Sequence, residues 1–247
     1  AATFVEADLT DDGIDNAVAY KIGQTLIIGS DNADTLVSGN DGSVFFGNAG
    51  DDQLTGGAGV DQLVGGLGND TLSGGGGVDV LDGSEGVDVA DYSGVATAIN
   101  VDLTLGNATG EDIGTDTLIN VENVIAGSGN DSITGDDSAN VITAGAGDDT
   151  LEGGAGNDVI VGGADTDTVV FAGNKGDFTF ELAADGTLTV TDTNTNTALG
   201  VDTISGVEKL SFNDGDLAVT TAAGGAVTLT GSGLNDDITL VGSVGAT

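Results

Sequence analysis

The sequence predicts an all-β fold, a right-handed parallel β-roll solenoid whose coils are glycine- and aspartate-rich nonamers. Residues 47–82 read as four consecutive nonamers, GNAGDDQLT, GGAGVDQLV, GGLGNDTLS and GGGGVDVLD. Each nonamer is rich in glycine at positions one to four and has aspartate at position six and leucine at position eight. Three residue types that keep one period over four repeats indicate a repeat architecture. The chain also contains no proline, which would remove a hydrogen-bond donor from a continuous sheet.

The composition favours inorganic cations as partners. The 247 residues include 41 acidic and 3 basic side chains, which gives a formal net charge of −38 at pH 7. Such an acidic surface repels nucleic-acid phosphate backbones and anionic headgroups, so we expect neither as a partner. No apolar run approaches the roughly 18 residues of a membrane span, so we expect no membrane insertion. Repulsion between the carboxylates makes disorder the state expected without counter-ions. Because 38% of the residues are apolar and recur periodically, disorder is not the expected state once cations are present.

Residues 1–28 precede the nonamers and are expected to lead into them through one or more strands. The apolar residues 25–28 favour a strand, whereas a short helix is considered for residues 14–22. The first array then covers residues 29–91 as seven nonamers. Its position-six residues are Asp34, Ser43, Asp52, Asp61, Asp70, Asp79 and Asp88. Its position-eight residues are Leu36, Phe45, Leu54, Leu63, Leu72, Leu81 and Ala90.

The period is interrupted over residues 92–125 and resumes in a second array. Apolar and polar residues alternate at 99–103, which predicts that the interruption continues the stack of strands with wider loops. The second array covers residues 126–170 as five nonamers. Its position-six residues are Asp131, Asn140, Asp149, Asp158 and Asp167, and its position-eight residues are Ile133, Ile142, Leu151, Ile160 and Val169.

Residues 171–219 are expected to form a β cap over the open end of the stack, because unpaired strand edges need cover. Within the cap, residues 178–182 and 187–191 flank Ala184-Asp185-Gly186, a pattern typical of a hairpin. Residues 220–247 form a C-terminal tail with a partial repeat, GSGLNDDIT, at 231–239.

The spacing of the aspartates predicts calcium sites between coils. Positions seven to nine form a short strand, the six preceding residues turn the chain, and two nonamers complete one coil. The position-six aspartate then lies above its equivalent 18 residues later, at the strand spacing of about 4.8 Å. Carboxylates and glycine carbonyls would form an all-oxygen cage, which suits calcium better than magnesium or zinc.

Pairing each loop with the loop one coil later gives five sites in the first array and three in the second, hence about eight calcium ions. The predicted carboxylate ligands are Asp34, Asp52, Asp61, Asp70, Asp79, Asp88, Asp131, Asp149, Asp158 and Asp167. The glycines predicted to line the sites are Gly47, Gly56, Gly57, Gly59, Gly65, Gly66, Gly68, Gly74, Gly75, Gly77, Gly153, Gly154 and Gly156.

The nonamers resemble the repeats-in-toxin (RTX) calcium-binding repeats of secreted bacterial proteins. The stretch DYSGVATAINVDLTLGNATG, followed by DTLINVENVIAGSGNDSITG, is similar to the link between RTX blocks, and DTVVFAGNKGDFTF and GVDTISGVEKLSF are similar to the segments that follow them. The resemblance implies a parallel β-roll, bound calcium, type I secretion and an extracellular or cell-surface location. Ser43 and Asn140 depart from the motif, so the sites that would use them are expected to be weak.

No catalytic constellation is expected in this chain. Histidine and cysteine are absent, which excludes an H-E-x-x-H helix and a Ser-His-Asp triad, and no G-x-S-x-G elbow occurs. Two candidate functions remain open. The favoured one is an extracellular structural protein or segment that folds on calcium binding and self-associates end to end into a filament, layer or adhesin. The alternative is a calcium-triggered folding and export module of a larger secreted enzyme or toxin.

Overall fold

The computed structural model describes residues 17–21, 24–183, 186–194, 199–221, 226–231 and 238–241. The chain divides into two compact units, Ala1–Ile125 and Ala126–Thr247, which are described separately. In each unit parallel strands from successive coils form two walls, so the predicted fold class, an all-β parallel β-roll, is confirmed.

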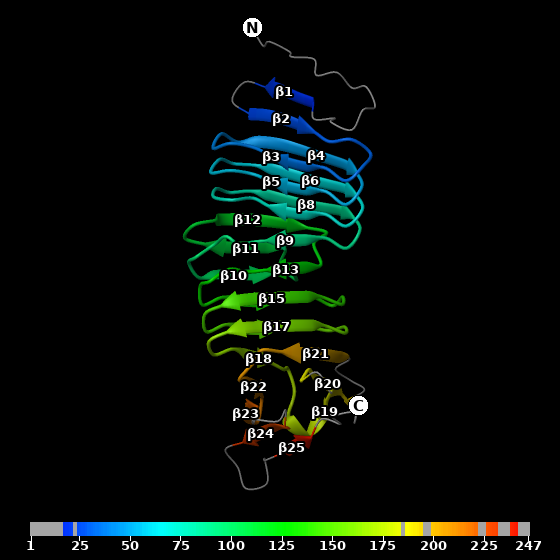
Figure 1. Ribbon diagram of the computed structural model, residues 1–247, viewed down its shortest axis with the longest axis vertical. Coiled ribbons are helices and arrows are strands. Elements are labelled where there is room, and N and C mark those ends of the chain that lie inside the picture. The colour runs from blue at the N-terminus through cyan, green and yellow to red at the C-terminus, as the bar shows by residue number, and fades with distance from the viewer. Residues whose placement is uncertain are drawn as a thin grey trace, which may run out of the picture. The chain divides into compact units, whose positions relative to one another are not determined.

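The first unit stacks its strands with an offset of one coil. One wall has the order β1-β2-β4-β6-β8-β12-β11-β10 and the other the order β13-β9-β7-β5-β3, and Figure 1 shows β4, β6 and β8 lying one below another. Leu54 pairs with Leu72 across neighbouring coils, 18 residues later. The strands are β1 (Ala17–Lys21), β2 (Gln24–Ile28), β3 (Thr35–Val37), β4 (Ser43–Ala49), β5 (Gln53–Thr55), β6 (Gln62–Leu67), β7 (Thr71–Ser73), β8 (Val80–Glu85), β9 (Val89–Asp91), β10 (Ile99–Asp102), β11 (Asn107–Gly110), β12 (Gly114–Ile119) and β13 (Asn123–Ile125).

Strand length differs between the walls, which corrects the expectation of short strands throughout. β5 has three residues, as expected, but β6 has six and β4 has seven. In the longer strands the ladder continues into the next nonamer, because Asn48 pairs with Gly66 as well as Phe45 with Leu63. The position-eight side chains form the core: all twelve are at most 1% exposed, including Phe45 of the degenerate second nonamer. Burying each large aliphatic side chain stabilises the coil by about 1.5–3 kcal/mol.

The N-terminal end of the first unit differs from expectation. Ala17–Lys21 form strand β1 instead of a helix, and β1 pairs antiparallel with all of β2, from Ala17–Ile28 to Lys21–Gln24. The strand that leads into the first array therefore has a partner on its outer edge. Pairing with the edge of β2 outweighs the local helix propensity of this segment.

Residues 92–125 first form antiparallel strand pairs and then rejoin the parallel stack. β10 pairs with β11 and β11 with β12, both antiparallel. β12 then rejoins the parallel ladder of β8, and β13 that of β9.

The second unit repeats this plan. Its walls have the orders β14-β16-β18-β22-β23-β24-β25 and β19-β20-β21-β17-β15. Beyond the array, β19 and β20 form an antiparallel pair, and Phe171 stacks on Phe212 with a centroid separation of 5.3 Å. The turn residues 184–185 and residues 232–237 of the partial repeat lie outside the described part of the chain. The elements are β14 (Ser132–Thr134), β15 (Val141–Ala146), β16 (Thr150–Glu152), β17 (Val159–Ala164), β18 (Thr168–Val170), the 3-10 helix η1 (Lys175–Asp177), β19 (Phe178–Leu182), β20 (Leu188–Asp192), β21 (Val201–Ser205), β22 (Lys209–Phe212), β23 (Gly215–Thr221), β24 (Ala226–Gly231) and β25 (Ile238–Val241).

Candidate calcium sites

The position-six side chains form ladders along the sides of the roll. From the second coil of each array onward, the Oδ1 atom of each aspartate accepts a hydrogen bond from the backbone N–H of the position-six residue one coil earlier. Asp34 N–H donates to Asp52 Oδ1 at 2.8 Å, and Asp52 N–H donates to Asp70 Oδ1 at 2.8 Å. The same contact joins Ser43 to Asp61, Asp61 to Asp79, Asp70 to Asp88, Asp131 to Asp149, Asn140 to Asp158 and Asp149 to Asp167. One oxygen of each of these accepting carboxylates is therefore held by the backbone of the preceding coil.

The second oxygen of most ladder carboxylates is buried without a hydrogen bond. This holds for the Oδ2 atoms of Asp52, Asp70, Asp79, Asp88, Asp149, Asp158 and Asp167. These side chains are at most 2% exposed. The pKa values of Asp52, Asp88 and Asp167 are raised to about 6, chiefly by burial and to a lesser extent by neighbouring acidic side chains. A buried ionised carboxylate oxygen is costly unless a cation compensates it.

Three position-six residues are instead satisfied within their own loop. Asp61 Oδ2 accepts from Gly57 N–H at 2.9 Å, and Asp34 Oδ2 accepts from Ser30 N–H at 2.6 Å. Asn140 Oδ1 accepts from Asp136 N–H at 2.9 Å. In all three loops the donor is the residue at position two.

The two classes of loop differ in backbone conformation. The loops of Asp52, Asp70, Asp79, Asp88, Asp149, Asp158 and Asp167 have positive φ at positions two and four, as at Gly66 and Gly68, both +123°. The loops of Asp34, Asp61 and Asn140 have no positive φ at either position. A flip of the peptide group between positions one and two exchanges the directions of its N–H and its C=O. In the positive-φ loops the N–H at position two therefore points away from the carboxylate, and Oδ2 lacks this hydrogen-bond donor.

Beside the glycine at position one, a backbone carbonyl oxygen of the next coil lies close to the Oδ2 atom of the aspartate. A Cβ atom added to Gly29 would lie 2.6 Å from Gly47 O and 2.7 Å from Asp34 Oδ2. Added Cβ atoms at Gly47 and Gly56 would likewise clash with the Oδ2 of their own aspartate and with the carbonyl one coil later. Two kinds of oxygen therefore border the same space, which a side chain on these glycines would enter. A set of carboxylate and carbonyl oxygens fits a hard cation such as calcium.

The structure brings all ten predicted aspartates into these ladders. Of the predicted glycines, Gly47, Gly56, Gly65, Gly74 and Gly153 lie against the carboxylate of their own nonamer. The positive-φ positions include Gly66, Gly68, Gly75, Gly77, Gly154 and Gly156. Gly57 and Gly59 belong to the self-satisfied loop of Asp61. Across the described residues no three acidic side chains converge on one point, so the candidate sites combine carboxylates with backbone carbonyls.

Sequence reasoning missed the acids at the C-terminal end of each ladder. Asp116 and Glu122 accept the backbone N–H groups of Asp79 and Asp88 in the first unit. Asp202 and Glu208 do the same for Asp158 and Asp167 in the second unit. They lie outside the nonamers, but both pairs belong to the pattern D-T-x-x-x-V-E, which was the available signal.

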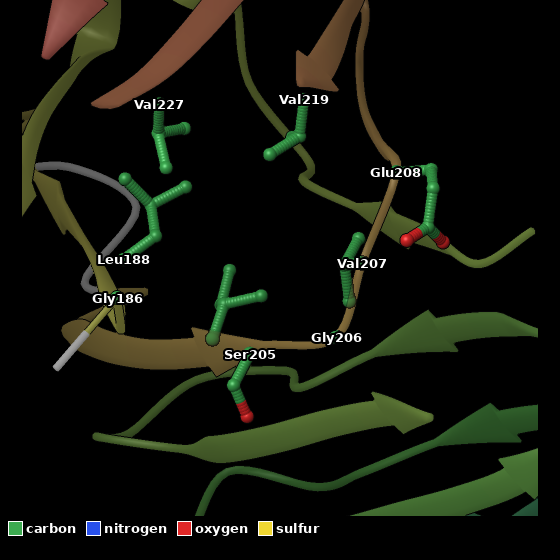
Figure 2. A pocket seen from close by; sticks show the side chains of 9 residues that line it. Gly186, Leu188, Ser205, Gly206, Val207, Glu208, Val219 and Val227 are labelled. Carbon is green, nitrogen blue, oxygen red and sulfur yellow. The ribbon is translucent and has the colours of Figure 1, made fainter. Parts of the chain in front are cut away.

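A pocket of about 270 Å³ lies beside Gly206 in the second unit (Figure 2). Its lining is largely aliphatic and includes Leu188, Val219 and Val227, with Glu208 as its titratable side chain. In Figure 2 the Ser205 hydroxyl points away from Val219 and Val227. The pocket thus brings together no nucleophile and base.

The ladders and the coiled sheets define a class of protein, the calcium-binding β-rolls. The family model for the RTX calcium-binding nonapeptide repeat matches four times, at residues 28–63, 55–90, 120–151 and 134–169. The nonamers are therefore RTX repeats, as their resemblance implied. A search of curated proteins finds no match. Among the described residues, none of the helical segments is long and apolar enough to cross a bilayer.

Proposed function

We propose that this chain is a calcium-dependent folding segment of an extracellular protein, with a structural and non-catalytic role. The buried Oδ2 atoms that accept no hydrogen bond are the observation that carries the proposal. A folded chain that buries ionised oxygens in this way needs bound cations. The expected load from the repeats is about eight ions, bound by aspartates and carbonyls of adjacent coils.

Calcium binding and folding are coupled in this proposal. The carboxylates and carbonyls of one site come from loops 18 residues apart, as Asp52 and Asp70 illustrate. Such a site does not exist in the unfolded chain, so the free energy of calcium binding contributes directly to the free energy of folding. The chain would remain unfolded where calcium is scarce and fold after export by a type I apparatus.

Calcium titration by circular dichroism tests the proposal. A chelated sample at pH 7.5 should lack the native β-sheet spectrum, and added calcium should restore it cooperatively. Magnesium at the same concentration is the control, because its preference for tight octahedral geometry with retained waters suits these sites poorly. A native spectrum with an unchanged melting temperature after complete chelation would refute the proposal.

The second candidate is a folding and export module within a larger secreted protein. The cover of β2 by β1 and the antiparallel strands β22 to β25 after the second array favour it over end-to-end assembly. Both features pair strand edges that would otherwise be free to join another chain.

A further inference from the structure

The segments 116–122 and 202–208 share one pattern in two places. They read DTLINVE and DTISGVE, and each follows an RTX array after a non-repeat stretch. Each pattern places an aspartate and a glutamate six residues apart, rather than the nine residues that separate the acids of successive nonamers. The pattern is therefore not itself a nonamer.

The strands of these segments nevertheless occupy repeat positions. Thr117 N–H donates to Asp79 O at 2.8 Å, as Thr71 N–H donates to Asp52 O within the array. Asn123 N–H makes the equivalent bond to Asp88 O at 2.9 Å. The residues at the position-eight places are buried: Leu118, Val124, Ile204 and Leu210 are at most 6% exposed. Each segment thus builds one last coil with shortened loops.

The acids of these segments make the hydrogen bond that defines the ladder. Asp79 N–H donates to Asp116 Oδ1 at 3.0 Å, and Asp88 N–H donates to Glu122 Oε2 at 2.8 Å. In the second unit Asp158 N–H donates to Asp202 Oδ1 at 3.0 Å. Asp167 N–H donates to Glu208 Oε2 at 2.9 Å, and Figure 2 shows Glu208 beside Val207 at the pocket edge.

Buried carboxylate oxygens also lie between these acids and the arrays, and they require a cation for the same reason as those between repeats. The Oδ2 atoms of Asp79, Asp88, Asp158 and Asp167, the last aspartates of the four ladders, are buried and accept no hydrogen bond. A Cβ at Gly83 would clash with Asp88 Oδ2 and Asn120 O, and one at Gly162 with Asp167 Oδ2 and Gly206 O. Asn120 and Gly206 have φ of +49° and +60°, so a carbonyl from the last coil replaces that of a repeat glycine.

We propose that the two D-T-x-x-x-V-E segments bind calcium and close the last site of every ladder. Asp116 and Glu122 would act with Asp79 and Asp88, and Asp202 and Glu208 with Asp158 and Asp167. The inference rests on the proposed calcium-dependent folding. It adds four sites to those formed between nonamers, so about twelve ions are expected per chain.

Calcium counting by equilibrium dialysis tests the proposal on Glu122→Gln and Glu208→Gln. The amide oxygen of glutamine can still accept the ladder hydrogen bond, while the charge is lost. Each variant should bind one ion fewer than the wild-type chain, and the double variant two fewer. The exposed Glu111→Gln and Glu181→Gln are matched controls that should bind the full number. Equal numbers and equal affinities in all variants would overturn the inference, whereas a wild-type chain that folds without calcium would overturn the proposed function instead.

A second measurement does not depend on the folding of acidic variants. Tyr92 Oη donates to Asp116 Oδ2 at 3.1 Å, so Tb³⁺ bound between Asp79 and Asp116 would lie near the phenol. Tyrosine-sensitised Tb³⁺ emission is expected from the wild-type chain and should largely disappear in Tyr92→Phe. Undiminished emission from Tyr92→Phe would place the Tb³⁺ elsewhere and count against the site at Asp116.

Discussion

At the scale of single residues, a ladder aspartate outside the self-satisfied loops, such as Asp70, has two separate tasks. Its Oδ1 fixes the neighbouring coil through a backbone hydrogen bond, as Asp70 does for Asp52 at 2.8 Å. Its Oδ2 is held in a buried place without a protein donor. The first contact sets the geometry, and the second creates the requirement for calcium. Structure and ion dependence therefore arise from the same side chain.

Replacing one ladder carboxylate should weaken calcium-induced folding. Asp70→Ala removes both contacts in the middle of the first array, so the calcium concentration at half-folding should rise roughly ten- to hundredfold. Asp31→Ala is the matched control, because Asp31 is exposed in a loop of the same unit. Calcium titrations followed by circular dichroism give both midpoints, and equal shifts for the two variants would contradict the assignment of Asp70.

Protons should partly replace calcium at low pH. Burial raises the pKa of Asp52, Asp88 and Asp167 from 3.8 to about 6, so the calcium-free fold binds protons that the unfolded chain releases. The free energy of unfolding of the calcium-free chain should therefore fall as pH rises from about 4 to about 6. With chelator present, we expect more β structure at pH 5 than at pH 7.5 by circular dichroism. A calcium-free spectrum that does not change between these pH values would disagree with this linkage.

At the scale of one element, the loop has two backbone states. In one state the N–H at position two satisfies the carboxylate, as Gly57 does for Asp61. In the other state positions two and four have positive φ and the carboxylate oxygen accepts no hydrogen bond. Glycine makes the second state accessible, because its φ can be positive without steric cost. The glycine richness of the nonamer thus serves ion binding as well as turning the chain.

A side chain at position two of a positive-φ loop should destabilise the roll. Gly66 has φ of +123°, and an added Cβ would clash with Asn48 O of the preceding coil. Gly66→Ala should lower the unfolding free energy in calcium by about 1–3 kcal/mol. At Gly94 an added Cβ meets nothing within 4 Å and φ is not in the positive range, so Gly94→Ala is the control. Denaturant unfolding at saturating calcium compares them, and equal stability of the two variants would argue against a tight loop contact.

At the scale of the whole molecule, each of the two units has the same plan. An RTX array is followed by a non-repeat stretch and then by a D-T-x-x-x-V-E segment that rejoins both walls. In the first unit the stretch contains the pair β10 and β11, and in the second it contains the pair β19 and β20. Each array therefore ends in its own terminal coil.

Paired outer strands should keep the calcium-loaded chain from associating end to end. β1 pairs with β2 over five residues, and β24 pairs with β25 over four. Multi-angle light scattering in calcium at high protein concentration should therefore give the mass of a monomer, 23.9 kDa. Deletion of residues 1–21 would uncover β2 and should promote association. A calcium-dependent polymer of the full chain would instead support a filament, layer or adhesin.

The sequence alone determined the repeat period, the parallel β-roll, the position-six acids and calcium as the matching ion. These follow from local chemistry, because a nonamer repeats the same turn, strand and inward side chain wherever it occurs. Only the tertiary structure decided which loops leave Oδ2 without a donor, how β1 covers β2, and that Asp116, Glu122, Asp202 and Glu208 end the ladders. Those acids meet their partners from 34 to 44 residues away, across stretches that break the period. Such contacts depend on how the non-repeat chain folds back, which the period does not encode.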